Sequence, residues 1–122
     1  MADIHFTEDH EWVRLDGDTV TIGITDYAQS QLGDLVFVEL PTVGQTVSKG
    51  EDTVVVESVK AASDVYCPVD GDVVEVNQAV VDNPALVNKE PLTGGWLFKV
   101  KPLDVGQLAD LMDEAAYNAM IA

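Results

Sequence analysis

The sequence has little positive charge, one cysteine and two histidines. Its 122 residues include six Lys and Arg against 22 Asp and Glu, a formal net charge of −16. Nucleic acid and anionic membranes would repel such a chain, so we expect partners with basic docking surfaces. The lone Cys67 cannot pair within the chain, and we expect it to pack as a small hydrophobe at a strand end. So few histidines and cysteines make a tight metal cluster unexpected.

Enzyme motifs and targeting segments are also missing. His10-Glu11-Trp12-Val13-Arg14 starts like a zinc-protease HExxH motif but has Arg14 where the second histidine is required. There is no Walker A sequence, no GxGxxG and no GxSxG nucleophile elbow. Residues 1–5 are acidic and lack the layout of a signal peptide, and no apolar run approaches membrane-spanning length. A cytoplasmic protein is the expectation, although a mature mitochondrial form would look similar.

Strand-forming sequence fills most of the chain, which is 47% hydrophobic and fits one globular domain, residues 1–122. Glu11–Leu15 and Thr19–Ile24 alternate about Asp16-Gly17, which predicts a hairpin with Val13, Leu15, Val20, Ile22 and Ile24 inward. The apolar run at residues 35–40 predicts a strand buried on both faces and ended by Pro41. Further strands are expected at residues 53–58, 64–66, 72–76 and 96–101, with Trp96, Phe98 and Val100 sharing a face.

Three segments carry helical signals. Residues 26–33 have Asp26 as N-cap, Gln29 placed as in a capping box, and Gly33 as the stop. Residues 83–87 predict one turn capped by Asn83, with Pro84 at the first helical position. Residues 104–122 predict an amphipathic helix across the sheet, following a β core at about 10–101. The apolar stripe of that helix comprises Val105, Leu108, Leu111, Met112, Ala115 and Ala119.

Lys60 lies inside an internal repeat. Residues 43–51 and 69–76 align when Gly44 is set against Gly71, with a strand, a turn carrying Lys60 and a second strand between them. This pattern predicts a pseudo-twofold β domain in which each half contributes a glycine turn and a strand. An isolated turn lysine is usually a solvated residue. A Schiff-base lysine needs burial or a cationic neighbour, whereas Glu57 and Asp64 favour the ammonium form. We therefore interpret Lys60 as a lysine displayed for attachment.

In their order and spacing, several motifs resemble the glycine cleavage system H protein family. They are His10-Glu11-Trp12, Gly23-Ile24-Thr25-Asp26-Tyr27-Ala28, Leu32-Gly33-Asp34, Val38-Glu39-Leu40-Pro41, Glu57-Ser58-Val59-Lys60-Ala61-Ala62-Ser63-Asp64 and Asn83-Pro84. The resemblance runs from about His10 to Lys101. It implies a mainly β fold, a lipoyl/biotinyl-domain-like barrel-sandwich hybrid with short helices and a C-terminal amphipathic helix. It also implies lipoic acid in amide linkage on Lys60.

The same resemblance implies a monomeric, non-catalytic carrier. It would take an aminomethyl group from glycine decarboxylase (P protein) to aminomethyltransferase (T protein), and a dithiol to dihydrolipoamide dehydrogenase (L protein). We expect the loaded amine in a cleft lined by Glu11 or Asp64, because a partly desolvated cation needs a carboxylate. Gly44, Glu57, Asp64 and Gly71 are expected to present the hairpin to the lipoate-attaching enzyme, the glycines through shape and the acids through charge. Simple solvation of the acids is the competing interpretation.

Two other functions fit parts of the pattern. A biotinyl carrier domain shares the fold and the hairpin lysine, but it typically flanks that lysine with methionines, where this chain has Val59 and Ala61. An H-like protein outside glycine breakdown, serving as a lipoyl relay or interaction module, is the second alternative. Cys67 stands where the family commonly has a small residue such as alanine, a substitution that a core position tolerates.

Overall fold

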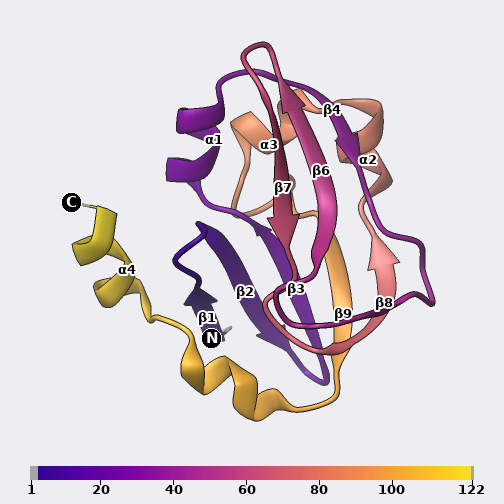
Figure 1. The fold of residues 1–122 in the computed structure, drawn as a ribbon, viewed down its shortest axis with the longest axis vertical. Helices are drawn as coiled ribbons and strands as arrows, with labels where there is room; N and C mark the ends of the chain where they lie inside the picture. The colour runs from indigo at the N-terminus through magenta and orange to yellow at the C-terminus, as the bar shows by residue number, and fades with distance from the viewer. Residues whose placement is uncertain (1–2, 122) are drawn as a thin grey trace.

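A computed structural model describes residues 3–121 of the chain (Figure 1). Two antiparallel sheets make up most of it, as the strand patterns predict. The larger sheet has the order β1-β2-β3-β9-β8-β5, and the smaller has the order β4-β6-β7. The strand bounds are β1 Asp3–Phe6, β2 Glu11–Asp16, β3 Thr19–Ile24, β4 Leu35–Glu39, β5 Thr46–Val47, β6 Asp52–Ser58, β7 Ala62–Tyr66, β8 Gly71–Val76 and β9 Phe98–Pro102.

The predicted first hairpin is confirmed, and it places its apolar side chains in the core. β2 and β3 pair with Asp16 opposite Thr19, and Gly17 in the turn has a φ of 64°, which glycine adopts cheaply. Val13, Val20, Ile22 and Ile24 are buried, while Leu15 is half-buried against the same cluster. This cluster continues through the inward residues of both sheets, among them Val38, Val54, Val56, Phe98 and Val100.

The prediction for β4 is wrong in one respect, because only one of its faces is buried. Leu35 and Val38 are buried, whereas Val36 is 58% exposed and Phe37 is 42% exposed. A register shift between Leu35 and Phe37, against β6, turns consecutive residues outward. β4 is also the edge of the three-stranded sheet, so it has a neighbouring strand on one side only.

Short helices lie between the strands, and their caps differ from prediction. α1 (Asp26–Leu32) is capped by Thr25, whose hydroxyl accepts the N–H of Ala28, while Gln29 bonds to Asp26 instead of closing a capping box. Gly33 ends α1 with a φ of 85°, as predicted. α3 (Ala85–Lys89) has Pro84 as N-cap, in place of Asn83. α2 (Gln78–Asp82), which the sequence patterns missed, is capped by Asn77.

The C-terminal segment is helical in two pieces, where one continuous helix was predicted. A 3-10 helix, η1 (Val105–Asp110), is followed by α4 (Glu114–Ile121), so the predicted end at Ala122 lies outside the described residues. Between them Met112 is extended, because its N–H and carbonyl pair with those of Phe6. Asp113 then accepts the N–H of Ala116 and starts a new helix. The buried residues also differ from the predicted apolar stripe. Leu108 is buried, but Val105, Ala115 and Ala119 are exposed. The buried side chain of α4 is Tyr117.

Tyr117 belongs to a second, smaller cluster with Phe6 and Trp12, at the side of the sheet where α4 lies against β1 (Figure 1). Trp96 packs against this cluster and precedes β9, so it does not share the buried face of Phe98 and Val100. None of the helices within residues 3–121 is both long enough and apolar enough to span a lipid bilayer.

The two repeat segments pair with each other, but their glycines differ. Gly44 donates its N–H to the carbonyl of Val73, and β5 pairs with the start of β8. Gly44 has a φ of 93° in a turn, as predicted. Gly71 is instead the buried first residue of β8, where a methyl group would collide with the backbone carbonyl of Lys101. Close packing, and not a turn, accounts for the glycine at position 71.

Candidate functional site

Lys60 lies at the tip of the β6–β7 hairpin, which projects beyond the rest of the smaller sheet (Figure 1). The turn closes through a hydrogen bond from the N–H of Ser58 to the carbonyl of Ala61, at 2.8 Å. The Ser58 hydroxyl oxygen also accepts the N–H groups of Lys60 and Ala61, both at 3.1 Å. Three residues, 59–61, connect the two strands, and neither Val59 nor Lys60 has the positive φ that two-residue hairpin turns usually need. Ser58 therefore holds a turn that contains no glycine.

The amine of Lys60 is exposed and makes no hydrogen bond or ion pair within residues 3–121. Its side chain lies over the C-terminal end of α1, where a methyl group built on Gly33 would be 3.2 Å from Cε of Lys60. The N–H of Val59 donates to the carbonyl of Asp34 at 3.1 Å, which joins the turn to the same segment. The lysine is thus available for acylation while its stem already rests beside α1.

Asn88 of α3 holds this end of α1 in place. Its amide nitrogen donates to the carbonyl of Gly33 and to Oε1 of Gln29, both at 2.9 Å. Its amide oxygen accepts the N–H of Leu35 at 2.9 Å. One half-buried side chain therefore joins α1, α3 and the start of β4 beneath the lysine turn. The sequence patterns did not single out Asn88, because its partners are distant in the chain.

A cavity of about 290 Å³ runs beside α1, and we call it the α1 cavity. It is lined by Leu32, Ala28 and Tyr27 of α1, by Asp64 of β7, and by Glu11 at the start of β2. Leu32 is next to Gly33, against which the Lys60 stem lies, so this wall of the cavity is one residue from the contact with Lys60. Its volume is near the lower end of ligand pockets in proteins. The structure thus brings Glu11 and Asp64 to one cavity, and that this cavity holds the loaded amine stays a prediction.

Glu11 is buried, with 3% of its surface exposed. Its Oε1 accepts the Thr7 hydroxyl at 2.9 Å, and its Oε2 accepts the N–H of Tyr66 at 2.9 Å. Burial raises the pKa of Glu11 to about 7, against the lowering effect of these two hydrogen bonds. Each carboxylate oxygen keeps a further lone-pair position. Glu11 can therefore accept further donors, and a cation would complete its electrostatic pairing.

The four residues expected to guide lysine modification occupy two ends of the hairpin. Glu57 pairs with Ala62 next to the turn, and Asp64 lies two residues further along β7; both are exposed. Gly71 begins β8 at the base of the hairpin, and Gly44 bonds to the same strand (Figure 1). The two acids therefore flank Lys60, and the two glycines shape the opposite end.

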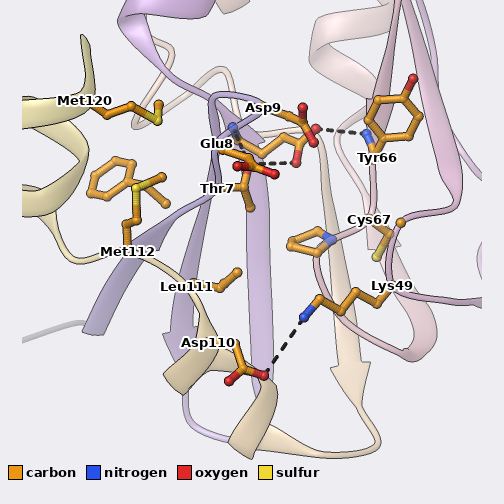
Figure 2. Close-up of a pocket in the computed structure, with 14 residues that line it drawn as sticks. Thr7, Glu8, Asp9, Lys49, Tyr66, Cys67, Asp110, Leu111, Met112 and Met120 are labelled. Atoms are coloured by element: carbon orange, nitrogen blue, oxygen red, sulfur yellow. Dashed lines mark hydrogen bonds and ion pairs between the residues drawn. The ribbon is translucent and has the colours of Figure 1, made fainter. Parts of the chain in front are cut away.

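A second cavity, of about 390 Å³, lies on the other side of Glu11 and Asp9, which line both cavities. Figure 2 shows its walls: Lys49 reaches Asp110 at 4.0 Å, and Met112 and Met120 face it from the C-terminal segment. Cys67 also lines it and is buried, with its thiol donating to the carbonyl of Val69. Burial raises the pKa of Cys67 to about 12, which disfavours the thiolate at neutral pH. The side chain packs in the hydrophobic core, as predicted.

His10 and Tyr117 are further residues beside the α1 cavity that the sequence patterns missed. His10 lines the cavity and, among non-glycine residues 3–121, has the one positive φ, at 68°. Its Nδ1 is 2.8 Å from the hydroxyl of Tyr117, which is 2.7 Å from Oγ1 of Thr25. Burial raises the pKa of Tyr117, against the lowering effect of its bond to Thr25. A histidine between two acids, Asp9 and Glu11, gives no sequence signal for positive φ.

Comparisons with known proteins agree with this geometry. The family model described as Glycine cleavage H-protein matches residues 4–122. The chain is 60% identical to the glycine cleavage system H protein of Bartonella tribocorum, over 99% of both chains. It is 54% identical to the H protein of Escherichia coli O7:K1, over 98% of this chain and 94% of the relative.

A solved structure gives the same result for the fold. The crystal structure of a glycine cleavage system H protein from Mycobacterium marinum superposes with a TM-score of 0.89 at 45% identity, covering 98% of this chain and 96% of that one. The two sheets with short helices are thus a lipoyl-domain-like barrel-sandwich hybrid, as the resemblance implied. This chain belongs to the glycine cleavage H-protein family.

Proposed function

We propose that the chain carries lipoic acid in amide linkage on Lys60 and shuttles an aminomethyl group within the glycine cleavage system. Membership of the family gives the general role of a lipoyl carrier component. The assignment to Lys60 is supported by the exposed amine at the tip of a hydrogen-bonded turn, without an ion pair in the described residues. That arrangement suits acylation by an enzyme, whereas Schiff-base chemistry needs a buried lysine or a cationic neighbour.

The residues around the α1 cavity fit such a group. Lipoic acid would supply a dithiol at the end of a long arm, and one of its sulfurs would hold the aminomethyl unit. Glu11 and Asp64 would hold the cationic amine, because both line the cavity that begins beside Lys60. The apolar side chains of Leu32, Ala28 and Val65 would cover the alkyl part of the arm. Replacing Glu11 by Ala should shorten the lifetime of the aminomethyl-loaded form, and an unchanged lifetime would remove Glu11 from this role.

The partners follow from the same proposal. Glycine decarboxylase (P protein) would load the arm, aminomethyltransferase (T protein) would unload it, and dihydrolipoamide dehydrogenase (L protein) would reoxidise the dithiol. The chain would catalyse none of these steps, and would act as a cytoplasmic monomer that docks with each enzyme in turn. With a net charge of −16, it should dock on basic surfaces. Tethering keeps the arm at high effective concentration in each docked active site.

For attachment, we propose that Glu57 and Asp64 contact the lipoate-attaching enzyme while Gly44 and Gly71 keep the base of the hairpin in shape. The acids are exposed on either side of Lys60. The collision of any side chain at Gly71 with Lys101 supports the shape role of that glycine.

The observation that carries the proposal is the position of Lys60, exposed at the turn and lying against the end of α1 where the acid-lined cavity begins. Reconstitution with purified P protein, glycine and labelled bicarbonate tests it. The lipoylated chain should support carboxyl exchange of glycine, and Lys60→Arg treated with the same lipoate-attaching enzyme should support none. Equal exchange by Lys60→Arg would refute the proposal.

A further inference from the structure

His10 and Glu11 are consecutive residues, yet both line the α1 cavity. In an extended chain, successive side chains point to opposite sides. The φ of 68° at His10, immediately before β2, breaks this alternation and directs both side chains to one cavity. Histidine adopts this conformation at a cost, and such strain is concentrated at functional sites. The strained backbone therefore needs an explanation in what the His10 ring does.

The hydrogen bonds around the ring determine where its proton lies. Thr25 is buried, and its Oγ1 accepts the N–H of Ala28, so the Thr25 hydroxyl proton needs an acceptor. Within the described part of the chain that acceptor is the Tyr117 hydroxyl, at 2.7 Å. Tyr117 can then donate its own proton to Nδ1 of His10, at 2.8 Å. With Nδ1 as an acceptor, the neutral ring carries its proton on Nε2.

The Nε2–H group has no hydrogen-bond partner among residues 3–121, and the ring lies against Tyr27 with centroids 4.7 Å apart. His10 is beside the start of α1, since its carbonyl accepts the N–H of Thr25. Lys60 is beside the other end of α1. The seven-residue helix between them is about 10 Å long. A group that reaches His10 from Lys60 is therefore the far end of an attached arm, where a lipoyl group has its sulfur atoms.

We propose that His10 is a binding residue for the sulfur end of the arm, to which it presents an Nε2–H donor in a tautomer set by Tyr117 and Thr25. This inference rests on the proposed function, in which Lys60 carries the arm. It divides recognition between two neighbours: Glu11 accepts from the ammonium, and His10 donates to a sulfur lone pair. Tyr117 is then a positioning residue, through which α4 contributes to the cavity without lining it.

The first test uses the unmodified full-length chain labelled with ¹⁵N-histidine. The chain has only two histidines, so a His5→Gln variant leaves the His10 signals alone and assigns them. Long-range ¹H–¹⁵N spectra should show His10 as the Nε2–H tautomer, and Tyr117→Phe should give a mixture of both tautomers. A wild-type ring protonated at Nδ1 would overturn the proposal.

The second test measures formaldehyde release from the lipoylated, aminomethyl-loaded chain, as water splits the carbon–sulfur bond to give the thiol, formaldehyde and ammonium. In His10→Asn the asparagine amide takes the place of Nδ1, and asparagine tolerates positive φ. The unfolding midpoint of this variant should therefore not fall below that of the wild type. We expect release about fivefold faster than wild type, the value of one hydrogen bond. His10→Gln places an N–H donor near the Nε2 position and should restore most of the protection. Wild-type release from His10→Asn would overturn the proposal.

The two tests separate this inference from the proposed function. If Glu11→Gln and Asp64→Asn accelerate release while His10→Asn does not, the arm docks in the cavity and only the role of His10 fails. If none of the three variants changes the release rate, docking of the arm fails and the inference fails with it.

Discussion

The backbone N–H of Tyr66 donates to Oε2 of Glu11 at 2.9 Å, so the end of the lysine-bearing hairpin is joined to a buried carboxylate at the start of β2. Because Thr7 occupies the other oxygen, Glu11 connects the β1–β2 loop, β2 and β7 at one point. Its charge state should therefore affect both the stability of the fold and the α1 cavity.

The first prediction concerns the pH dependence of stability. Burial raises the pKa of Glu11 to about 7 in the folded chain, above its ordinary value of 4.5. Folding thus favours the protonated form of Glu11. The free energy of unfolding of the wild type, relative to that of Glu11→Gln, should therefore be greatest below pH 4.5 and should fall as the pH rises through 7. At about 1.36 kcal/mol per pH unit, the loss should be about 3 kcal/mol. Urea unfolding of both chains at pH 4, 6 and 8 measures it, and parallel pH profiles would contradict the assignment.

Gly33 and Gly17 offer a matched pair for the lysine site. Both have positive φ, at 85° and 64°, but only Gly33 lies against Lys60, while no atom lies within 4 Å of a methyl group on Gly17. Alanine at Gly17 should destabilise the fold by about 1–2 kcal/mol through backbone strain. Alanine at Gly33 should cost more, because its φ of 85° and ψ of −163° lie in a region that is essentially confined to glycine. Only Gly33→Ala should also slow lipoylation of Lys60, because the added methyl group crowds the lysine stem. Equal lipoylation rates for the two variants would argue against the contact.

Ser58 should determine how firmly the lysine turn is held. Ser58→Ala removes the acceptor of two backbone N–H groups and should destabilise the hairpin by about 1 kcal/mol, with faster amide exchange at Lys60 and Ala61. Ser58→Thr keeps the hydroxyl and should behave like wild type. Ser30→Ala is the control, since it removes an exposed hydrogen bond on α1 to the carbonyl of Tyr27. Unchanged exchange in Ser58→Ala would show that the turn does not depend on this side chain.

The negative charge of Glu57, close to Lys60, should affect the rate at which lipoic acid is attached. Glu57→Ala should lower the rate of lipoylation several-fold in a purified assay, because the enzyme would lose an ion pair next to its target. Asp82→Ala removes another exposed acid, on α2, and should be lipoylated at the wild-type rate. If Glu57→Ala is lipoylated as fast as Asp82→Ala, the acids near the lysine are simply solvated.

Local sequence patterns predicted the elements whose signals are local. Asp16-Gly17 between alternating segments gave the β2–β3 hairpin, and Gly33 gave the end of α1, because each depends on a few neighbouring residues. The helix N-cap was predicted one residue late, since Thr25 and Asp26 are both good caps and only the bond to Ala28 distinguishes them.

Features that depend on distant contacts were predicted less well. The exposed face of β4 follows from its place at a sheet edge, and the break in the C-terminal helix follows from the pairing of Met112 with Phe6. At the site, the family motif indicated Lys60, Glu11 and Asp64. His10 and Tyr117 escaped prediction because they lie 107 residues apart and meet only in the fold. Asn88 escaped for the same reason, since its partners lie on α1 and β4.

The central claim is that Lys60 carries lipoic acid. The most direct test is the intact mass of the protein purified from its native source, followed by peptide mapping across residues 54–66 and across the segment that contains Lys49. We expect a lipoyl mass increment on Lys60 and none on Lys49, which is also exposed in a turn. A biotinyl increment, or an unmodified Lys60 that purified lipoate ligase also fails to modify, would contradict it.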